Sequence, residues 1–363
     1  MRRILPEHSL LPRNVGDSMW THHKAGMWLD EGIWAPLFAP PSSNTSFAGP
    51  SAGSFPDIHA IVKASQFAQA EALRFAYQAA RRRKPHRSLM ASWTFDEPWP
   101  NAAHGCIVDY YGLPKMGFYW VRDALRMVDV ALAYSDIHTP VGQQLRATVW
   151  VDTEHAWLRN ISVRVRYFDA VTGVLLQQEV LESTEVASPL APVEVGRLSF
   201  TPPATMAGGV LLVRVTLSSF TQPDSDSSPI ESDYFFGIRP PALSTTIASA
   251  LSLSQGGVLY PLLASPNSSL TIRQTASGTP AAQTLSFAVA NAGSHAPVLF
   301  VKPTVRNGSG AQLGYLPFTR GFFTLMPGEV ATISLMARVL PLTAKLVCVQ
   351  AWNADRICLT LRT

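Results

Sequence analysis

The chain has 363 residues, of which 47% are hydrophobic and only 15% are charged, and its formal net charge is +4. This composition excludes a disordered chain, and the length exceeds what one hydrophobic core usually serves, so two or three domains are expected. No apolar run approaches the ~20 residues of a membrane span, and the first residues lack the apolar core of a signal peptide. We therefore expect a globular protein of several domains with no membrane partner.

A long helix is predicted over residues 57–84, where neither glycine nor proline occurs and apolar side chains recur at helical spacing. Ser54 to Asp57 has the form of a capping box at its start. The basic run Arg81–Lys84 favours a helix C-terminus, where cations meet the negative end of the helix dipole. A nucleic-acid patch is the alternative, but no second basic cluster supports it, so no nucleic-acid partner is expected.

Residues 87–95, RSLMASWTF, are short and apolar and precede a proline-rich loop, which predicts a buried strand. A second helix is predicted from Lys115 to Arg126. Helix, strand, loop and helix form an α/β pattern, but one strand cannot make a sheet. We therefore expect residues 1–127 to pack against segments outside this chain, which would complete the sheet.

The rest of the sequence has the pattern of two all-β modules. Apolar and polar side chains alternate with the period of a half-buried strand, as at Ile161, Val163, Val165 and Tyr167. Turn residues separate further strands at the spacing of a β-sandwich, and Pro240–Pro241 closes the first module. The expected fold class is therefore α/β followed by all-β, with β-sandwiches over residues 128–241 and 242–363.

The three cysteines are too few for a disulfide scaffold. Cys348 and Cys358 lie on two strands of a predicted hairpin and fall opposite each other, so they form either a cross-strand disulfide or two free thiols. Cys106 is left unpaired. No Cys/His cluster has metal-ligand spacing, and no metal or organic cofactor is expected.

Four Asn-x-Ser/Thr sequons, at Asn44, Asn160, Asn267 and Asn307, include half of the eight asparagines. Sequons at this density favour a protein of the secretory pathway, either secreted or lysosomal.

The stretch from Ser92 to Trp120 combines aromatic residues, prolines and the adjacent acids Asp96 and Glu97. A retaining glycosidase uses two carboxylates about 5 to 5.5 Å apart. Consecutive residues of an extended chain point to opposite sides, so Asp96 and Glu97 cannot be that pair. At most one of them lines a pocket, and the alternative is that both are loop acids making caps and hydrogen bonds.

The aromatic residues suit a different role in this stretch. Flat aromatic faces at the C-terminal end of a strand can stack on the apolar face of a sugar. We predict that Trp93 is a pocket wall, whereas Trp99, Tyr119 and Trp120 pack in the core.

The phrases Trp-x-x-x-Glu-Pro-Trp-Pro, at 93–100, and Val-Asp-Tyr-Tyr-Gly-x-Pro-Lys, at 108–115, resemble the last barrel strand, loop and helix of glycoside hydrolase family 2, in its β-mannosidase-like branch. Residues 64–84 resemble the helix before that strand, and 4–28 the segment after the seventh strand. FFTLMPGEVATISL, at 322–335, resembles the closing sandwich domain. The resemblance is strongest over residues 1–135.

This resemblance implies that residues 1–127 end a (β/α)₈ barrel, that both sandwiches are immunoglobulin-like, and that the enzyme hydrolyses terminal β-linked glycans with retention. The family's two catalytic glutamates lie upstream of the matched region, so it implies no catalytic residue here, and Glu7 and Glu31 are not substitutes. Trp93 is carried over as a sugar-stacking wall, with Asp96 or Glu97 as a hydroxyl contact.

Two hypotheses about function follow from these patterns. In the first, the chain is the C-terminal part of a β-mannosidase-like hydrolase, inactive alone, whose partner is the N-terminal part of the same enzyme. In the second, it is a non-catalytic carbohydrate-binding or interaction protein built on two β-sandwiches.

Overall fold

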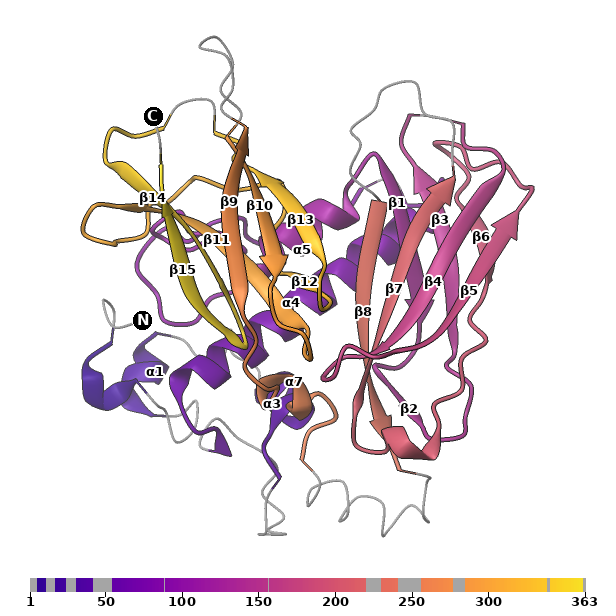
Figure 1. The fold of residues 1–363 in the computed structure, drawn as a ribbon, viewed down its shortest axis with the longest axis horizontal. Coiled ribbons are helices and arrows are strands. Elements are labelled where there is room, and N and C mark those ends of the chain that lie inside the picture. The colour runs from indigo at the N-terminus through magenta and orange to yellow at the C-terminus, as the bar shows by residue number, and fades with distance from the viewer. Residues whose placement is uncertain are drawn as a thin grey trace.

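The computed structural model describes residues 5–10, 17–23, 31–41, 54–87, 89–155, 157–219, 230–240, 256–276, 285–337 and 340–361. These residues are mostly in β-strands, which form two sandwiches, and two packed helices run behind and between them (Figure 1). This composition of elements agrees with the β-sandwich part of the expected fold class.

The helical elements precede the first strand, apart from two short ones. They are η1 (Glu7–Ser9), α1 (Ser18–His22), α3 (Glu31–Phe38), α4 (Ile58–Arg81) and α5 (Met116–Ala124), and later η3 (Ala204–Met206) and α7 (Tyr260–Leu263). Among the residues that the structure describes, no helix is both long and apolar enough to cross a membrane.

Helix α4 ends at Arg81, which confirms that the basic run Arg81–Lys84 marks a helix C-terminus. Its start differs from the prediction. Asp57 is the N-cap, and its carboxylate accepts a hydrogen bond from the Ala60 backbone N–H at 2.8 Å, so the capping box from Ser54 was wrong. A carboxylate directly before the first turn already satisfies an unpaired N–H there. Helix α5 confirms the second predicted helix and packs along α4.

The first sandwich pairs a three-stranded sheet, in the order β1-β3-β6, with a five-stranded sheet, in the order β2-β8-β7-β4-β5. Side chains of β4 at 161, 163, 165 and 167 are buried in the core between these sheets, as the period of two predicted. The strands are β1 (Val128–Tyr134), β2 (His138–Pro140), β3 (Ala147–Thr153), β4 (Ile161–Asp169), β5 (Leu175–Ser183), β6 (Val193–Arg197), β7 (Val210–Ser219) and β8 (Ile230–Arg239).

The second sandwich pairs the sheet β13-β10-β9 with the sheet β12-β11-β14-β15. In the hairpin β14–β15, Cys348 lies opposite Cys358 and the two form a disulfide, whereas Cys106 is free. The strands are β9 (Leu270–Ala276), β10 (Ser286–Asn291), β11 (Val298–Asn307), β12 (Phe323–Leu325), β13 (Val330–Ser334), β14 (Ala344–Ala351) and β15 (Ala354–Thr360).

The two sandwiches and the helices meet around Phe67 on α4, whose side chain is fully buried. Aromatic rings surround it with centroids 5.3 to 6.3 Å away, and they come from five separate elements. They belong to Phe38 of α3, Trp120 of α5, Phe235 of β8, Phe300 of β11 and Trp352 of the β14–β15 turn. One side chain thus takes part in the packing of the helices and of one sheet from each sandwich.

A buried ion-pair network joins the two sandwiches beside this aromatic junction. The guanidinium of Arg214 on β7 is only 2% exposed, and it donates to Asp233 of β8 at 2.6 and 2.8 Å. It also donates to Glu329 of the second sandwich at 2.8 and 3.0 Å and to the carbonyl of Thr324 at 2.9 Å. Opposite charges that satisfy each other in this way fix the relative position of the two sheets.

Charged side chains also attach the end of α4 to the first sandwich. Lys84 donates to Asp152 of β3 at 3.0 Å and to Glu154 at 2.7 Å, and Arg81 pairs with Asp152. Asp129 of β1 lies opposite Asp152 in the strand register, and one of its carboxylate oxygens accepts from Gln78 at 3.0 Å. Burial raises the pKa of Asp129 to about 6, although Arg126 and Arg81 oppose the shift.

We expect Phe67→Ala to lower the free energy of unfolding by about 3–5 kcal/mol, because the cavity would open where the helices meet both sandwiches. Urea unfolding followed by circular dichroism measures this. Phe75→Ala, on the same helix but 38% exposed, is the matched control and should cost only about 1 kcal/mol. Equal losses in the two variants would contradict the role assigned to Phe67.

Asp129 should make the protein more stable in mild acid. Its folded pKa of about 6 exceeds the unfolded value of 3.8, so its contribution to stability is complete below pH 3.8 and is lost as the pH rises through 6. Asp129→Asn removes this dependence. The free energy of unfolding of the variant, minus that of the native protein, should therefore be about 2 kcal/mol greater at pH 7.5 than at pH 4.5.

Urea unfolding at the two pH values measures the difference. The control is Asp136→Asn in the exposed loop after β1, which should show no such change. A relative stability of Asp129→Asn that does not depend on pH would show that the Asp129 carboxylate is not perturbed.

Candidate functional site

The segment at residues 89–95 is extended and lies with one face against the helices. Met90 packs against the cluster formed by Tyr77 of α4 with Val121 and Ala124 of α5, and the Ser92 hydroxyl lies 2.7 Å from the Tyr77 hydroxyl. The other face consists of alternate residues that are open to solvent. Their exposed fractions are 87% for Leu89, 82% for Trp93 and 57% for Phe95.

The prediction of a buried strand over residues 87–95 was therefore wrong. Arg87 and residues 89–95 contain no strand. In the part of the chain that the structure describes, the backbone of 89–95 bonds to another backbone segment only at its end, where the Phe95 carbonyl accepts from the N–H groups of Ile107 and Val108 at 3.1 Å. A strand requires a partner along its edge and a cover on each apolar face. Within the described residues the helices cover only one face of this segment.

Asp96 and Glu97 point to opposite sides, as expected for consecutive residues in an extended chain. Asp96 is exposed, whereas Glu97 is buried and forms an ion pair with Lys115 at the start of α5. The same ammonium group also donates to the carbonyl of His104 at 3.4 Å. Glu97 therefore holds the loop from 98 to 114 against α5, and the Asp96 carboxylate is the one that faces solvent.

Cys106 fixes the chain beneath this segment. Its thiol lies 2.7 Å from the Thr94 hydroxyl, 3.0 Å from the Asp96 carbonyl and 2.9 Å from Nδ1 of His104. Burial raises the pKa of the Cys106 thiol and lowers the pKa of His104. The thiol is thus a neutral hydrogen-bonding group that positions the backbone of 94–96, and it lacks the thiolate character of a nucleophile.

The aromatic residues of the loop divide into an exposed and a buried set. Tyr119 and Trp120 are 1% and 6% exposed, which confirms their place in the core. Trp99 was also expected in the core, but 59% of it is exposed, and Tyr110 is 44% exposed. The later part of the loop from 98 to 105 packs on the helices through Ala102 and Ala103, whereas residues 98–100 at its start are exposed, and Trp99 with them.

This arrangement presents an aromatic face and a carboxylate without a catalytic pair. Asp109 of the same loop accepts bonds from the N–H groups of Tyr111 and Leu113, both at 2.9 Å, and Glu97 is paired. Among the described residues of this loop, Asp109 is half-buried and Asp96 is the acid that is exposed to solvent. It can accept hydrogen bonds from hydroxyl groups, and Trp93 can stack on an apolar face, so the surface is suited to binding a sugar.

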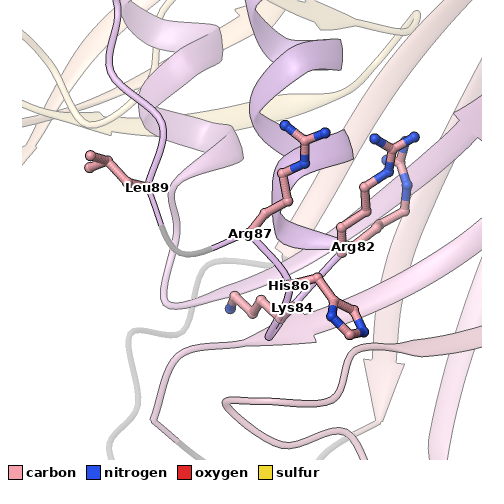
Figure 2. Close-up of a pocket in the computed structure, with 6 residues that line it drawn as sticks. Arg82, Lys84, His86, Arg87 and Leu89 are labelled. Atoms are coloured by element: carbon pink, nitrogen blue, oxygen red, sulfur yellow. The ribbon is translucent and has the colours of Figure 1, made fainter.

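A basic hollow beyond the end of α4 is a second candidate site. Figure 2 shows Arg82, Lys84, His86, Arg87 and Leu89, which line it together with Arg83. Lys84 is neutralised by Asp152 and Glu154, and Arg82 donates to the carbonyl of Leu132 at 3.4 Å. These charges attach α4 to the first sandwich, so we assign the hollow a structural role.

A cavity of about 50 Å³ lies at the junction of α4, α5 and the two sandwiches, between Arg74, Trp120 and Asp233. It is far smaller than the 300–1,000 Å³ or so of a usual ligand pocket. In the described parts of the chain, no group of three or more His, Cys, Asp or Glu residues is arranged to hold a metal ion. The open surface around Trp93 therefore remains the candidate functional site.

Comparisons with known proteins agree with this fold. No family model and no curated protein sequence matches the chain. The structure is similar to that of an exo-chitosanase from Amycolatopsis orientalis, solved with PNP-beta-D-glucosamine, with a TM-score of 0.62 and 16% identity over 94% of this chain and 40% of that chain. It is also similar to a beta-D-mannosidase from Dictyoglomus thermophilum, with a TM-score of 0.54 and 16% identity over 83% of this chain and 31% of that chain.

The chain thus spans less than half the length of these two structural neighbours. At 16% identity the likeness concerns the fold, and both neighbours are glycoside hydrolases by name. The fold of this chain is therefore like that of these glycoside hydrolases, which agrees with the fold that the sequence resemblance implied.

Two residues that fix the candidate site were not expected from the sequence. Lys115 was noted only as the start of a helix, and Cys106 only as an unpaired thiol. The only sequence feature that marks Lys115 is its place between a proline and an apolar helix. Lysines occur at such positions for many reasons, so this feature does not predict an ion pair. The Glu97–Lys115 pair spans 18 positions of irregular loop, so no periodicity connects the two.

The two adjacent acids should respond differently to neutralisation. Glu97→Gln leaves the mostly buried Lys115 without its partner, and we expect a loss of about 3 kcal/mol in the free energy of unfolding. Asp96→Asn is the matched control and should change stability by no more than about 0.5 kcal/mol. Thermal and urea unfolding of both variants test this, and equal effects would contradict the opposite placement of the two carboxylates.

Proposed function

We propose that this chain is part of a retaining β-glycosidase, of the β-mannosidase-like branch, that hydrolyses terminal β-linked sugars. The likeness in fold to an exo-chitosanase and a β-mannosidase over most of the chain supports this proposal. The observation that carries it is the segment 89–95, in which Trp93 is 82% exposed and lies three residues before the exposed Asp96.

In this proposal the chain supplies the wall of the sugar-binding pocket. Trp93 stacks on the apolar face of the sugar, and Asp96 accepts a hydrogen bond from a hydroxyl group. Glu97, the other predicted hydroxyl contact, instead holds the loop through Lys115. The two carboxylates that retaining hydrolysis requires are contributed by segments outside these 363 residues.

The open apolar face suggests where those segments bind. We propose that Leu89, Trp93 and Phe95 line the interior of a (β/α)₈ barrel whose other strands come from the N-terminal part of the same enzyme. Residues 1–127 are then the end of the barrel domain, and residues 128–241 and 242–363 are immunoglobulin-like domains. Exposed Asn160 and Asn267, at the surface of these sandwiches, are compatible with a secreted or lysosomal glycoprotein.

A non-catalytic carbohydrate-binding protein is the second candidate. Each sandwich has its own buried core, around Val163 in the first and Phe287 in the second, as an independent binding module requires. In that case the same exposed aromatic residues would bind a glycan without any hydrolysis.

The isolated chain should not hydrolyse aryl β-mannosides or aryl β-glucosaminides, because in this proposal the nucleophile and the general acid come from other segments. Release of p-nitrophenol from the two p-nitrophenyl glycosides measures this, with a commercial β-mannosidase as the positive control. Turnover that survives both Trp93→Ala and Asp96→Asn would contradict the assignment of the site.

The size of the native polypeptide tests the proposed partner. An antibody against residues 128–363 should detect a product well above the 39.5 kDa of this chain, and peptide mapping should place additional sequence before residue 1. A native product of 39.5 kDa with no associated chain would favour the non-catalytic binding protein.

A further inference from the structure

A loop of the second sandwich contacts the loop that follows the candidate site in the chain. The backbone N–H of Tyr315 donates to the carbonyl of Gly112 at 2.7 Å. A Cβ atom on Gly314 would lie 2.0 Å from the carbonyl oxygen of Tyr111, so the two loops are in backbone contact there. Residues about 200 positions apart in the sequence thus form one surface.

The ring of Tyr315 rests on Gly112. A Cβ atom at Gly112 would lie 2.3 to 2.7 Å from three atoms of the ring, so any other residue would displace the ring. Tyr315 nevertheless remains 67% exposed, so the glycine supports the ring without covering most of it. The backbone φ of Tyr315 is 55°, in the left-handed region that favours glycine. Residues held in such a conformation cluster at functional sites.

The loop on which Tyr315 rests is connected to the candidate site. Its residue Val108 forms a parallel bridge with Asp96. The same loop carries Tyr110, which is 44% exposed. Exposed aromatic side chains of the second sandwich and of this loop therefore lie on chain segments that are in contact.

The loop that carries Tyr315 is fixed in place by α5. Arg122 donates to the carbonyl of Phe318 at 2.6 Å, and the Trp120 indole N–H donates to the carbonyl of Phe322 at 3.3 Å. A Cβ atom on Gly321 would lie 2.6 Å from the Tyr119 ring. The ring is thus presented by a rigid support, which lowers the entropy lost when a ligand stacks on it.

We propose that Tyr315 is a further sugar-binding residue, which stacks on another pyranose unit of the glycan that Trp93 binds. The second sandwich then contributes directly to recognition of a β-linked oligosaccharide. This inference rests on the proposed function, since both assign the surface around Trp93 to a glycan.

Binding of β-1,4-linked glucosamine and mannose tetrasaccharides to the chain tests the inference, by isothermal titration calorimetry and saturation-transfer NMR. We expect Tyr315→Ala to weaken binding about three- to tenfold, as the loss of one stacked ring does, and Tyr315→Phe to retain it. The matched control is Trp157→Ala between β3 and β4, where the side chain is also 67% exposed. Near-ultraviolet circular dichroism checks that each variant is folded.

The outcomes separate the two proposals. Weaker binding in both Tyr315→Ala and Trp93→Ala, with Trp157→Ala unchanged, supports the role of Tyr315. Binding that is lost in Trp93→Ala but unchanged in Tyr315→Ala overturns this inference and leaves the proposed function intact. If the native chain binds neither tetrasaccharide, both proposals are overturned.

Discussion

The packing of aromatic rings around Phe67 is the constraint on which the rest of the structure depends. Helix α4 carries this side chain into the space where both sandwiches, α3 and α5 converge, and each of them contributes a ring. Because these contacts are apolar and close-packed, α4 has one position relative to the sandwiches. The charged contacts of Arg214 and Arg81 then select the rotation of the layers around that core. Every feature of the candidate site is placed by α4 or by α5, which packs along it.

The candidate site reverses the usual distribution of polar and apolar side chains. Leu89, Trp93 and Phe95 are exposed, whereas the adjacent Glu97 is buried with Lys115. A buried ion pair is tolerated only where its partners satisfy each other, and here the pair ties an irregular loop to a helix. A row of exposed apolar side chains marks a surface that binds a ligand or another protein segment. The ion pair and the helices therefore hold in place the exposed apolar face formed by Leu89, Trp93 and Phe95.

In the function that we propose, the residues that bind the sugar and the residues that cleave the glycosidic bond lie on different segments. The chain provides flat aromatic surfaces and a solvent-facing carboxylate, which select a sugar by shape and hydroxyl contacts. The bond-breaking groups belong to other strands of the same barrel. The contact between Tyr315 and Gly112 extends this division, because a β-sandwich far along the chain then shapes the same surface. A β-sandwich that packs against a barrel domain can in this way take part in the choice of substrate as well as in stability.

The sequence by itself determined the elements whose signals are local. The apolar spacing of residues 58–81 and the period of two at 161–167 each require one kind of structure, and the spacing of Cys348 and Cys358 places them opposite each other in a hairpin. The opposite directions of Asp96 and Glu97 follow from extended geometry alone. Only the tertiary structure decided that residues 89–95 form no strand, that Trp99 is exposed and that Glu97 pairs with Lys115. These outcomes depend on which distant segments cover a given side chain, and local periodicity contains no information about such segments.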